Sequence, residues 1–81
     1  MAGPNNQMQS LTEIERTKIQ ILGLRLVYND GYDMWSVSRA DGKWLRYTKY
    51  DGGTLAPAKY EATDVRALIH RACEVGDDLW D

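Results

Sequence analysis

His70 and Cys73 are the two side chains in this sequence that could act together as nucleophile and base or as metal ligands. They lie three positions apart in a stretch with helical periodicity, so a helix would bring them close together on its surface. Two ligands do not complete a zinc site. Cys73 also falls in an apolar stripe, which predicts a buried, inert thiol beside a solvated His70 imidazole. The sequence therefore predicts no metal site and no cofactor.

Carboxylates for acid–base catalysis could come from four aspartates that sit in or beside predicted turns. Asp is favoured at turns because its side chain hydrogen-bonds to nearby main-chain groups. The glycines form no phosphate-binding pattern, and a domain of this size seldom provides the pocket that a catalytic pair needs. We therefore predict that the protein is not an enzyme. The four residues are Asp30, Asp33, Asp41 and Asp51.

The elements that must position any functional surface are three predicted antiparallel strands, at residues 24–28, 32–39 and 43–50. They are rich in β-branched and aromatic residues, which suit a pleated surface. The turns between them, Asp30-Gly31 and Asp41-Gly42, are strong hairpin signals because Gly adopts positive φ without steric cost. The sequence thus predicts a three-stranded meander.

The first turn sets the register of the first two strands. If Asp30-Gly31 is a two-residue loop, Leu26 lies opposite Trp35 and Leu24 opposite Val37. The predicted inner face of these strands comprises Leu24, Leu26, Tyr28, Trp35 and Val37.

The second turn allows two registers. A two-residue Asp41-Gly42 loop places Trp44, Arg46 and Thr48 on the inner face. A three-residue loop at 40–42, with Gly in the left-handed region, places Leu45 and Tyr47 there instead. We favour the longer loop because it keeps the charge of Arg46 out of the core.

The first helix is predicted to begin at a capping box formed by Ser10 and Glu13. Gly23 stands where a left-handed residue would end it. An alternative starts the first strand at 18 or 19, because Ile19 and Ile21 also alternate. The predicted inner face of the helix comprises Leu11, Ile14, Ile21 and Leu22, with Lys18 interrupting it.

The last helix is predicted to start at the N-cap Thr63, followed by Asp64 at its positive end, and to stop at Gly76. Its apolar residues follow a helical period, so we expect it to pack on the inner face of the sheet. The stripe comprises Val65, Leu68, Ile69, Ala72 and Cys73. The fold class is therefore predicted as α+β in the order αβββα.

The predicted organisation is a disordered lead-in at 1–9, a single domain at 10–76 and an acidic tail at 77–81. Trp80 in the tail has two readings: it packs back on the sheet, which we favour, or it projects as a partner-binding residue. A core this small is near the limit for independent stability, so a homodimer would be in keeping with the size.

The charges nearly balance, with 10 Lys and Arg against 12 Asp and Glu. A net charge of −2 gives no support to a nucleic-acid or membrane partner for the chain as a whole. One cysteine excludes an intramolecular disulfide, and the N-terminus lacks the pattern of a secretory signal. We expect a cytoplasmic setting.

The predicted order of elements over residues 11–76 resembles the double-stranded-RNA-binding domain. Its strands followed by a helix resemble the arm-binding domains of tyrosine recombinases. The RNA-binding fold has a cluster of lysines at the start of its last helix, where this chain has Thr63, Asp64, Val65 and Arg66. No family residue is therefore carried over to this sequence.

Aromatic and basic side chains gather on the predicted outward face of the sheet. Such combinations suit either protein interface anchors or stacked bases, although an ordinary exposed sheet face could also carry them, as could a second core face covered by the first helix. The predicted binding residues are Arg25, Met34, Trp44, Arg46 and Tyr50. We expect a small binding protein, of the accessory or inhibitor kind carried by phages and mobile elements, that masks a partner protein. The alternative is a nucleic-acid-binding module that uses Arg25, Arg39, Arg46 and Lys49.

Overall fold

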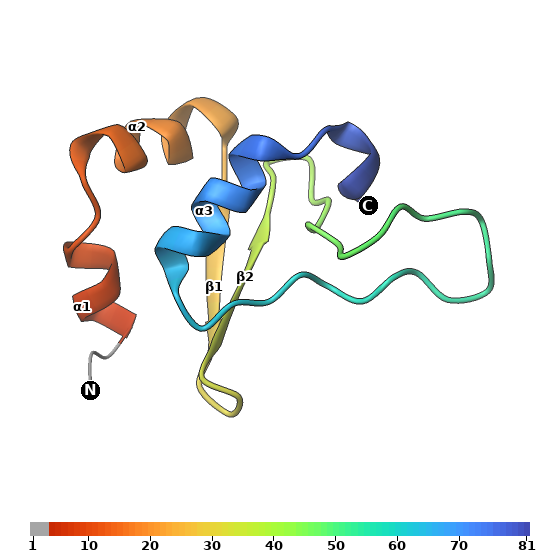
Figure 1. Ribbon diagram of the computed structural model, residues 1–81, viewed down its shortest axis with the longest axis horizontal. Coiled ribbons are helices and arrows are strands. Elements are labelled where there is room, and N and C mark those ends of the chain that lie inside the picture. Colours follow the sequence, from red (N-terminus) through yellow and green to blue (C-terminus); the bar gives the residue numbers. More distant parts are fainter. Residues whose placement is uncertain (1–3) are drawn as a thin grey trace.

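A computed structural model describes residues 4–81 and shows an α+β arrangement in which three helices lie beside a single β-hairpin (Figure 1). The predicted three-stranded meander is wrong, because only two strands form within the described residues. The predicted resemblance to the double-stranded-RNA-binding domain is also lost, because it depended on a third strand. The elements are α1 (Pro4–Gln9), α2 (Glu13–Leu22), β1 (Arg25–Asn29), β2 (Met34–Ser38), α3 (Val65–Glu74) and the 3-10 turn η1 (Asp77–Leu79).

The hairpin register differs from the prediction by two residues. Leu26 pairs with Val37, and Tyr28 pairs with Trp35. The turn is longer because the Asn29 side chain accepts the Gly31 amide hydrogen, and Asp33 then takes a left-handed φ of 53°. A shift of two residues keeps every side chain on its predicted face, since strand faces alternate with a period of two. Trp35 and Val37 are accordingly buried.

The second turn has the three-residue form that the sequence favoured. Gly42 adopts a φ of 85°, and Arg39 N–H donates to the Lys43 carbonyl at 2.8 Å. Ser38 therefore pairs with Trp44, which turns Leu45 into the core, where it is completely buried. This part of the prediction is confirmed.

The third strand fails because two separate segments share the free side of β2. Leu45 N–H donates to the Val37 carbonyl, whereas Trp35 and Ala62 each donate a main-chain N–H to the carbonyl of the other. Beyond this point the chain leaves the sheet, and residues 48–56 form an exposed loop that projects from the molecule (Figure 1). Tyr47, predicted to lie on the inner face, is half exposed at the base of this loop.

Helix α2 begins two residues later than predicted. The sequence contains two overlapping capping boxes, and the one that forms is Thr12 with Glu15. Gly23 ends the helix with a φ of 64°, as predicted. The predicted face is wrong: Ile14 and Ile21 are 69% and 75% exposed.

The core side of α2 carries Glu15, which is buried, and Ile19, which is half-buried. Lys18 lies on the same side as Ile14 and Ile21 by helical spacing, and this side faces solvent. The charge that interrupts the apolar pattern therefore marks the exposed side of the helix.

Helix α3 covers the inner face of the hairpin with the predicted residues Val65, Leu68, Ile69 and Ala72, all of which are buried. Its N-cap is Asp64 and not Thr63, since the Asp64 carboxylate accepts the Arg66 amide hydrogen. Cys73 is exposed, which contradicts the predicted buried thiol. It stands at the edge of the stripe, one position beyond the residues that contact the sheet.

Residues 4–9, within the predicted disordered lead-in, form α1, while residues 1–3 of that prediction lie outside the described residues. The Gln7 side chain accepts the Val65 amide hydrogen at 2.9 Å and donates to the Thr63 carbonyl, so it caps α3 from a distance in sequence. Arg16 and Arg66 donate to main-chain oxygens at the end of α1 and just beyond it.

The C-terminal segment folds back, as the favoured reading of Trp80 predicted. Trp80 is 6% exposed and belongs to the hydrophobic core. Leu45 pairs with it, and Trp44 exchanges two main-chain hydrogen bonds with Asp81. The Arg39 guanidinium lies 4.9 Å from the centroid of the Trp80 ring. Among the helices of the described residues, none is long and apolar enough to cross a bilayer.

Candidate functional site

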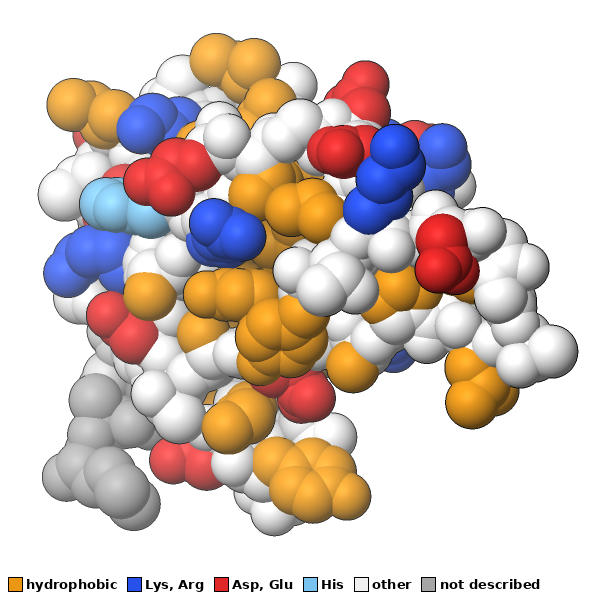
Figure 2. Space-filling model, turned by 45° about the vertical axis from the view of Figure 1, so that its right-hand side comes forward, with side chains coloured by type: hydrophobic (Ala, Val, Ile, Leu, Met, Phe, Trp, Pro, Cys, Tyr) orange, Lys and Arg blue, Asp and Glu red, His pale blue; other side chains and the backbone are white. Residues whose placement is uncertain are grey.

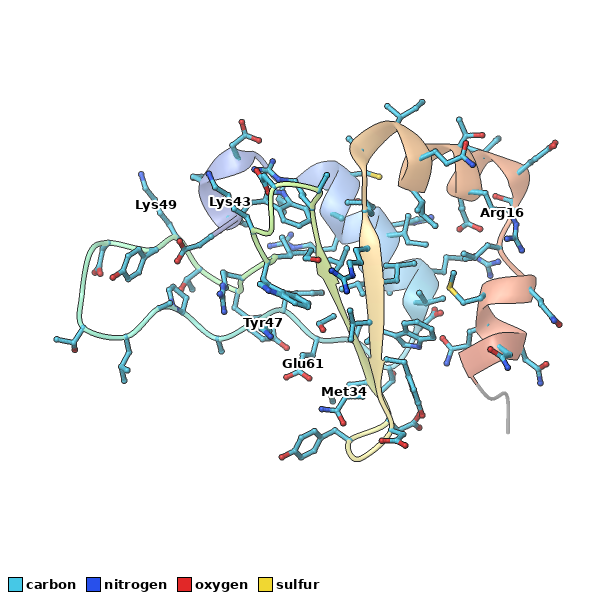
Figure 3. The ribbon with its side chains drawn as sticks, turned by 180° about the vertical axis from the view of Figure 1, so that it is seen from behind. Arg16, Met34, Lys43, Tyr47, Lys49 and Glu61 are labelled. Carbon is cyan, nitrogen blue, oxygen red and sulfur yellow. The ribbon has the colours of Figure 1, made fainter. Side chains whose placement is uncertain are left out.

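Within residues 4–81, no helix covers the side of the hairpin opposite α3, and we call this side the outer face (Figure 3). Side chains reach it from alternate positions of β1 and β2 and from the segment that follows the second turn. Its exposed and half-buried members are Arg25, Val27, Asn29, Met34, Ser36, Trp44, Arg46 and Lys59, and Ser38 on the same side is buried.

Arg25 and Met34, two of the predicted binding residues, lie at opposite ends of this face. Arg25 is exposed at the start of β1, and Met34 is half-buried at the start of β2. Val27, 36% exposed, stands between the two ends on β1 and was not among the predicted residues. Its position was implied by the same alternation that placed Arg25 outward.

Trp44 extends the outer face beyond the hairpin. Its ring is half-buried, and the Lys59 ammonium lies 3.8 Å from the ring centroid. This cation–π contact holds an aromatic plane and a positive charge together at the surface. Lys59 was missed because its strand-like pairing with Arg46 joins segments that are distant in sequence.

Arg46 also points away from the core, but its donors are already used. The guanidinium donates to the main-chain oxygen of Asp81 through two nitrogens and to that of Pro57 through a third. It therefore ties the C-terminal segment to the connector that precedes α3. Its predicted role as an interface anchor competes with this internal role.

Tyr50 does not join the other predicted binding residues. It lies in the projecting loop, 39% exposed, and its hydroxyl donates to the Gly53 carbonyl at 2.6 Å. The loop separates it from the sheet because the third strand, on which its placement depended, does not form.

The basic residues of the nucleic-acid alternative are only partly available. Arg39 forms ion pairs with Asp41 and Asp77 at 3.2 and 2.9 Å, and Arg46 is engaged as described. Arg25 and Lys49 have no ion pair among the described residues. Two of the four positive charges are thus satisfied within the fold.

A buried carboxylate, Glu15, was missed by sequence reasoning although the second capping box pointed to it. It accepts hydrogen bonds from Thr12 N–H and from Arg66 Nε, both at 2.8 Å. These contacts, above all the Thr12 amide, lower the pKa of Glu15 to about 2 against the opposing effect of burial. His70 Nε2 lies 3.2 Å from the same carboxylate, so the partner of His70 is Glu15 and not Cys73.

Asp41 and Asp51 confirm the local role predicted for turn aspartates, since each accepts the main-chain amide hydrogen of the residue two positions on. Asp41 accepts the Lys43 amide hydrogen, and this bond lowers the pKa of its carboxyl. Asp33 accepts the Tyr28 hydroxyl, which raises the pKa of that phenol. The bonds of Asp41 and Asp51 to the main chain stabilise their turns, whereas Asp33 bonds to a side chain.

Hydrophobic side chains also reach the surface on the side that carries α3, in a band between the helices and the projecting loop (Figure 2). Within residues 4–81 the structure encloses no pocket. The same part of the chain contains no group of three His, Cys, Asp or Glu residues placed to hold a metal ion.

Comparison of the chain with known protein families, with curated proteins and with solved structures found no match.

Proposed function

We propose that the protein is a small non-enzymatic binding protein that masks a partner protein with its outer face. The observation that supports this is the absence, within the described residues, of any helix over Arg25, Val27, Met34 and Trp44. An aromatic ring, a flexible apolar side chain and an arginine on one rigid sheet are the kinds of residue that dominate protein interfaces. We propose that it acts in the cytoplasm. We also propose that it is one of the accessory or inhibitor proteins of phages and mobile elements.

A protein partner is favoured over nucleic acid by the internal use of Arg39 and Arg46. Nucleic-acid affinity comes largely from positive charges that contact phosphates. Of the remaining basic residues, Arg25 and Lys59 lie on the outer face and Lys49 lies in the projecting loop, on a chain whose net charge is −2. They are better suited to orient an acidic protein surface than to hold a polyanion.

The proposal is tested by using the full chain as bait in a lysate of its source cells. We expect Met34→Ala combined with Trp44→Ala to remove the captured protein while the chain stays folded. The control combines Ile14→Ala with Leu55→Ala, which removes two apolar side chains that are 69% and 85% exposed away from the outer face. A folded double variant of the outer face that still captures the same protein would reject the proposal.

The nucleic-acid alternative makes a separate forecast. Gel shifts with duplex DNA and RNA over a series of salt concentrations would show binding that weakens steeply as salt rises, because phosphate contacts release counterions. Binding of that kind, lost on Arg25→Ala with Lys49→Ala, would replace the protein-binding proposal.

A further inference from the structure

Among residues 4–81, no segment pairs with the edge of β1 that faces away from β2. On the other strand, Trp35 and Val37 direct their main-chain groups away from β1, toward Ala62 and Leu45. The groups of Met34, Ser36 and Ser38 must therefore face β1, since strand hydrogen-bonding directions alternate.

It follows that Leu26 and Tyr28 on β1 direct their N–H and C=O groups to the open side. Nothing in residues 4–81 pairs with that side of the strand. An exposed edge strand is a template for another strand unless a bulge, a proline or a charge near its centre protects it. β1 pairs regularly along its length, and its one charged residue, Arg25, stands at its start.

We propose that β1 pairs antiparallel with β1 of a second copy of the chain, so that two hairpins form one four-stranded sheet. A twofold axis at Val27 sets Leu26 opposite Tyr28 of the second copy. The main-chain groups that point to the open side of each strand then face one another. The open N–H and C=O groups of both residues are then paired across the axis.

The side chains are self-complementary in this register. Val27 meets Val27 of the second copy on the outer face, a β-branched pair of the kind that stabilises sheets. Arg25 lies opposite Asn29 of the second copy, so no two like charges meet. On the inner face Leu26 lies opposite an aromatic residue, Tyr28.

Exposed apolar side chains on two other turns of the fold are consistent with the same register. Pairing carries the hairpin turn of the second copy past Leu24, to the C-terminal turn of α2. That turn presents Ile21 and Leu22, 75% and 42% exposed, while the hairpin turn presents Tyr32, 74% exposed. The pairing thus brings together apolar side chains that a single molecule leaves in water.

A cysteine at the axis tests the register. In a non-hydrogen-bonded antiparallel pair the Cα atoms are about 4.5 Å apart, which a disulfide can span. We expect Val27→Cys, in a chain with Cys73→Ser, to form a covalent dimer under mild oxidation. Arg25→Cys in the same background should form no disulfide with its own copy, yet should cross-link when mixed with Asn29→Cys.

A charge at the axis tests the association itself. We expect Val27→Lys to halve the mass measured by sedimentation equilibrium while circular dichroism shows a chain that is still folded, because the variant opposes like charges across the axis at a position that is exposed in the single molecule. Val27→Thr, also β-branched and neutral, should remain dimeric. A wild-type chain that is monomeric at every concentration, or a Val27→Cys chain that does not cross-link, would overturn the inference. Capture of a partner by the outer face would stand in either case.

Discussion

Glu15 is a buried charge whose donors come from two sides, the Thr12 amide within its own helix and the Arg66 guanidinium on α3. Its pKa, lowered from 4.5 to about 2, shows that the folded chain favours the ionised form. A carboxyl with a lowered pKa stabilises the fold above its ordinary pKa, and this contribution is lost as the pH falls toward the lowered value. Stability should therefore decline between pH 4.5 and about pH 2.

Replacing Glu15 by Gln should destabilise the fold by about 1.5–3 kcal/mol, the usual contribution of hydrogen bonds to a charged group. The variant should also lose part of the decline in stability below pH 4.5. Urea unfolding at a series of pH values measures both effects. Glu13→Gln, an exposed residue of the same helical turn, is the control. Equal curves for the two variants would contradict the buried role of Glu15.

Cys73 is exposed on α3, so a thiol reagent should reach it in the folded chain. We expect the native labelling rate to be close to the rate in denaturant, since access and thiolate formation control the reaction. Labelling followed by absorbance gives both rates. Native labelling that is slower by orders of magnitude would mean that Cys73 is covered, as the apolar stripe alone suggested.

At the scale of elements, α3 is the helix on which the core depends. Leu68 is completely buried between α3 and the hairpin, whereas Leu55 is 85% exposed in the projecting loop. Leu68→Ala should cost about 2–5 kcal/mol through the cavity it opens, and Leu55→Ala should cost almost nothing. Denaturant unfolding compares the same chemical change at the two sites. Similar losses would contradict the docking of α3.

Local patterns in the sequence predicted those parts of the fold that depend on local geometry. The left-handed glycines at Gly23 and Gly42 and the buried side of α3 follow from single-residue conformations and helical period. The hairpin register was wrong because the Asn29 side chain, not the Asp-Gly pair alone, set the length of the turn.

Pairings between distant segments were not predictable in the same way. The bond of Gln7 to Val65 and the pairing of Trp35 with Ala62 leave no periodic trace in the sequence. The same holds for the candidate site: Arg25, Met34 and Trp44 were placed correctly by alternation, whereas the capture of Arg46 by main-chain oxygens required the folded C-terminal segment.

At the scale of the whole molecule, the C-terminal segment completes the core. Trp80 is 6% exposed, while Trp44 is half-buried on the outer face. We expect Trp80→Ala to cost about 3–5 kcal/mol and Trp44→Ala clearly less. Thermal unfolding of the two variants measures the difference. A Trp80→Ala chain as stable as the wild type would mean that the segment does not pack as described.

The projecting loop at 48–56 has a practical consequence. Its ends are joined where Tyr47 N–H donates to the Ala58 carbonyl at 3.2 Å, and every residue between 48 and 56 is exposed. Closing a longer loop over the same base adds little entropic cost. A guest peptide, such as an epitope or a protease recognition sequence, could therefore be grafted between Gly52 and Gly53, and the chain would display it while the scaffold keeps its shape.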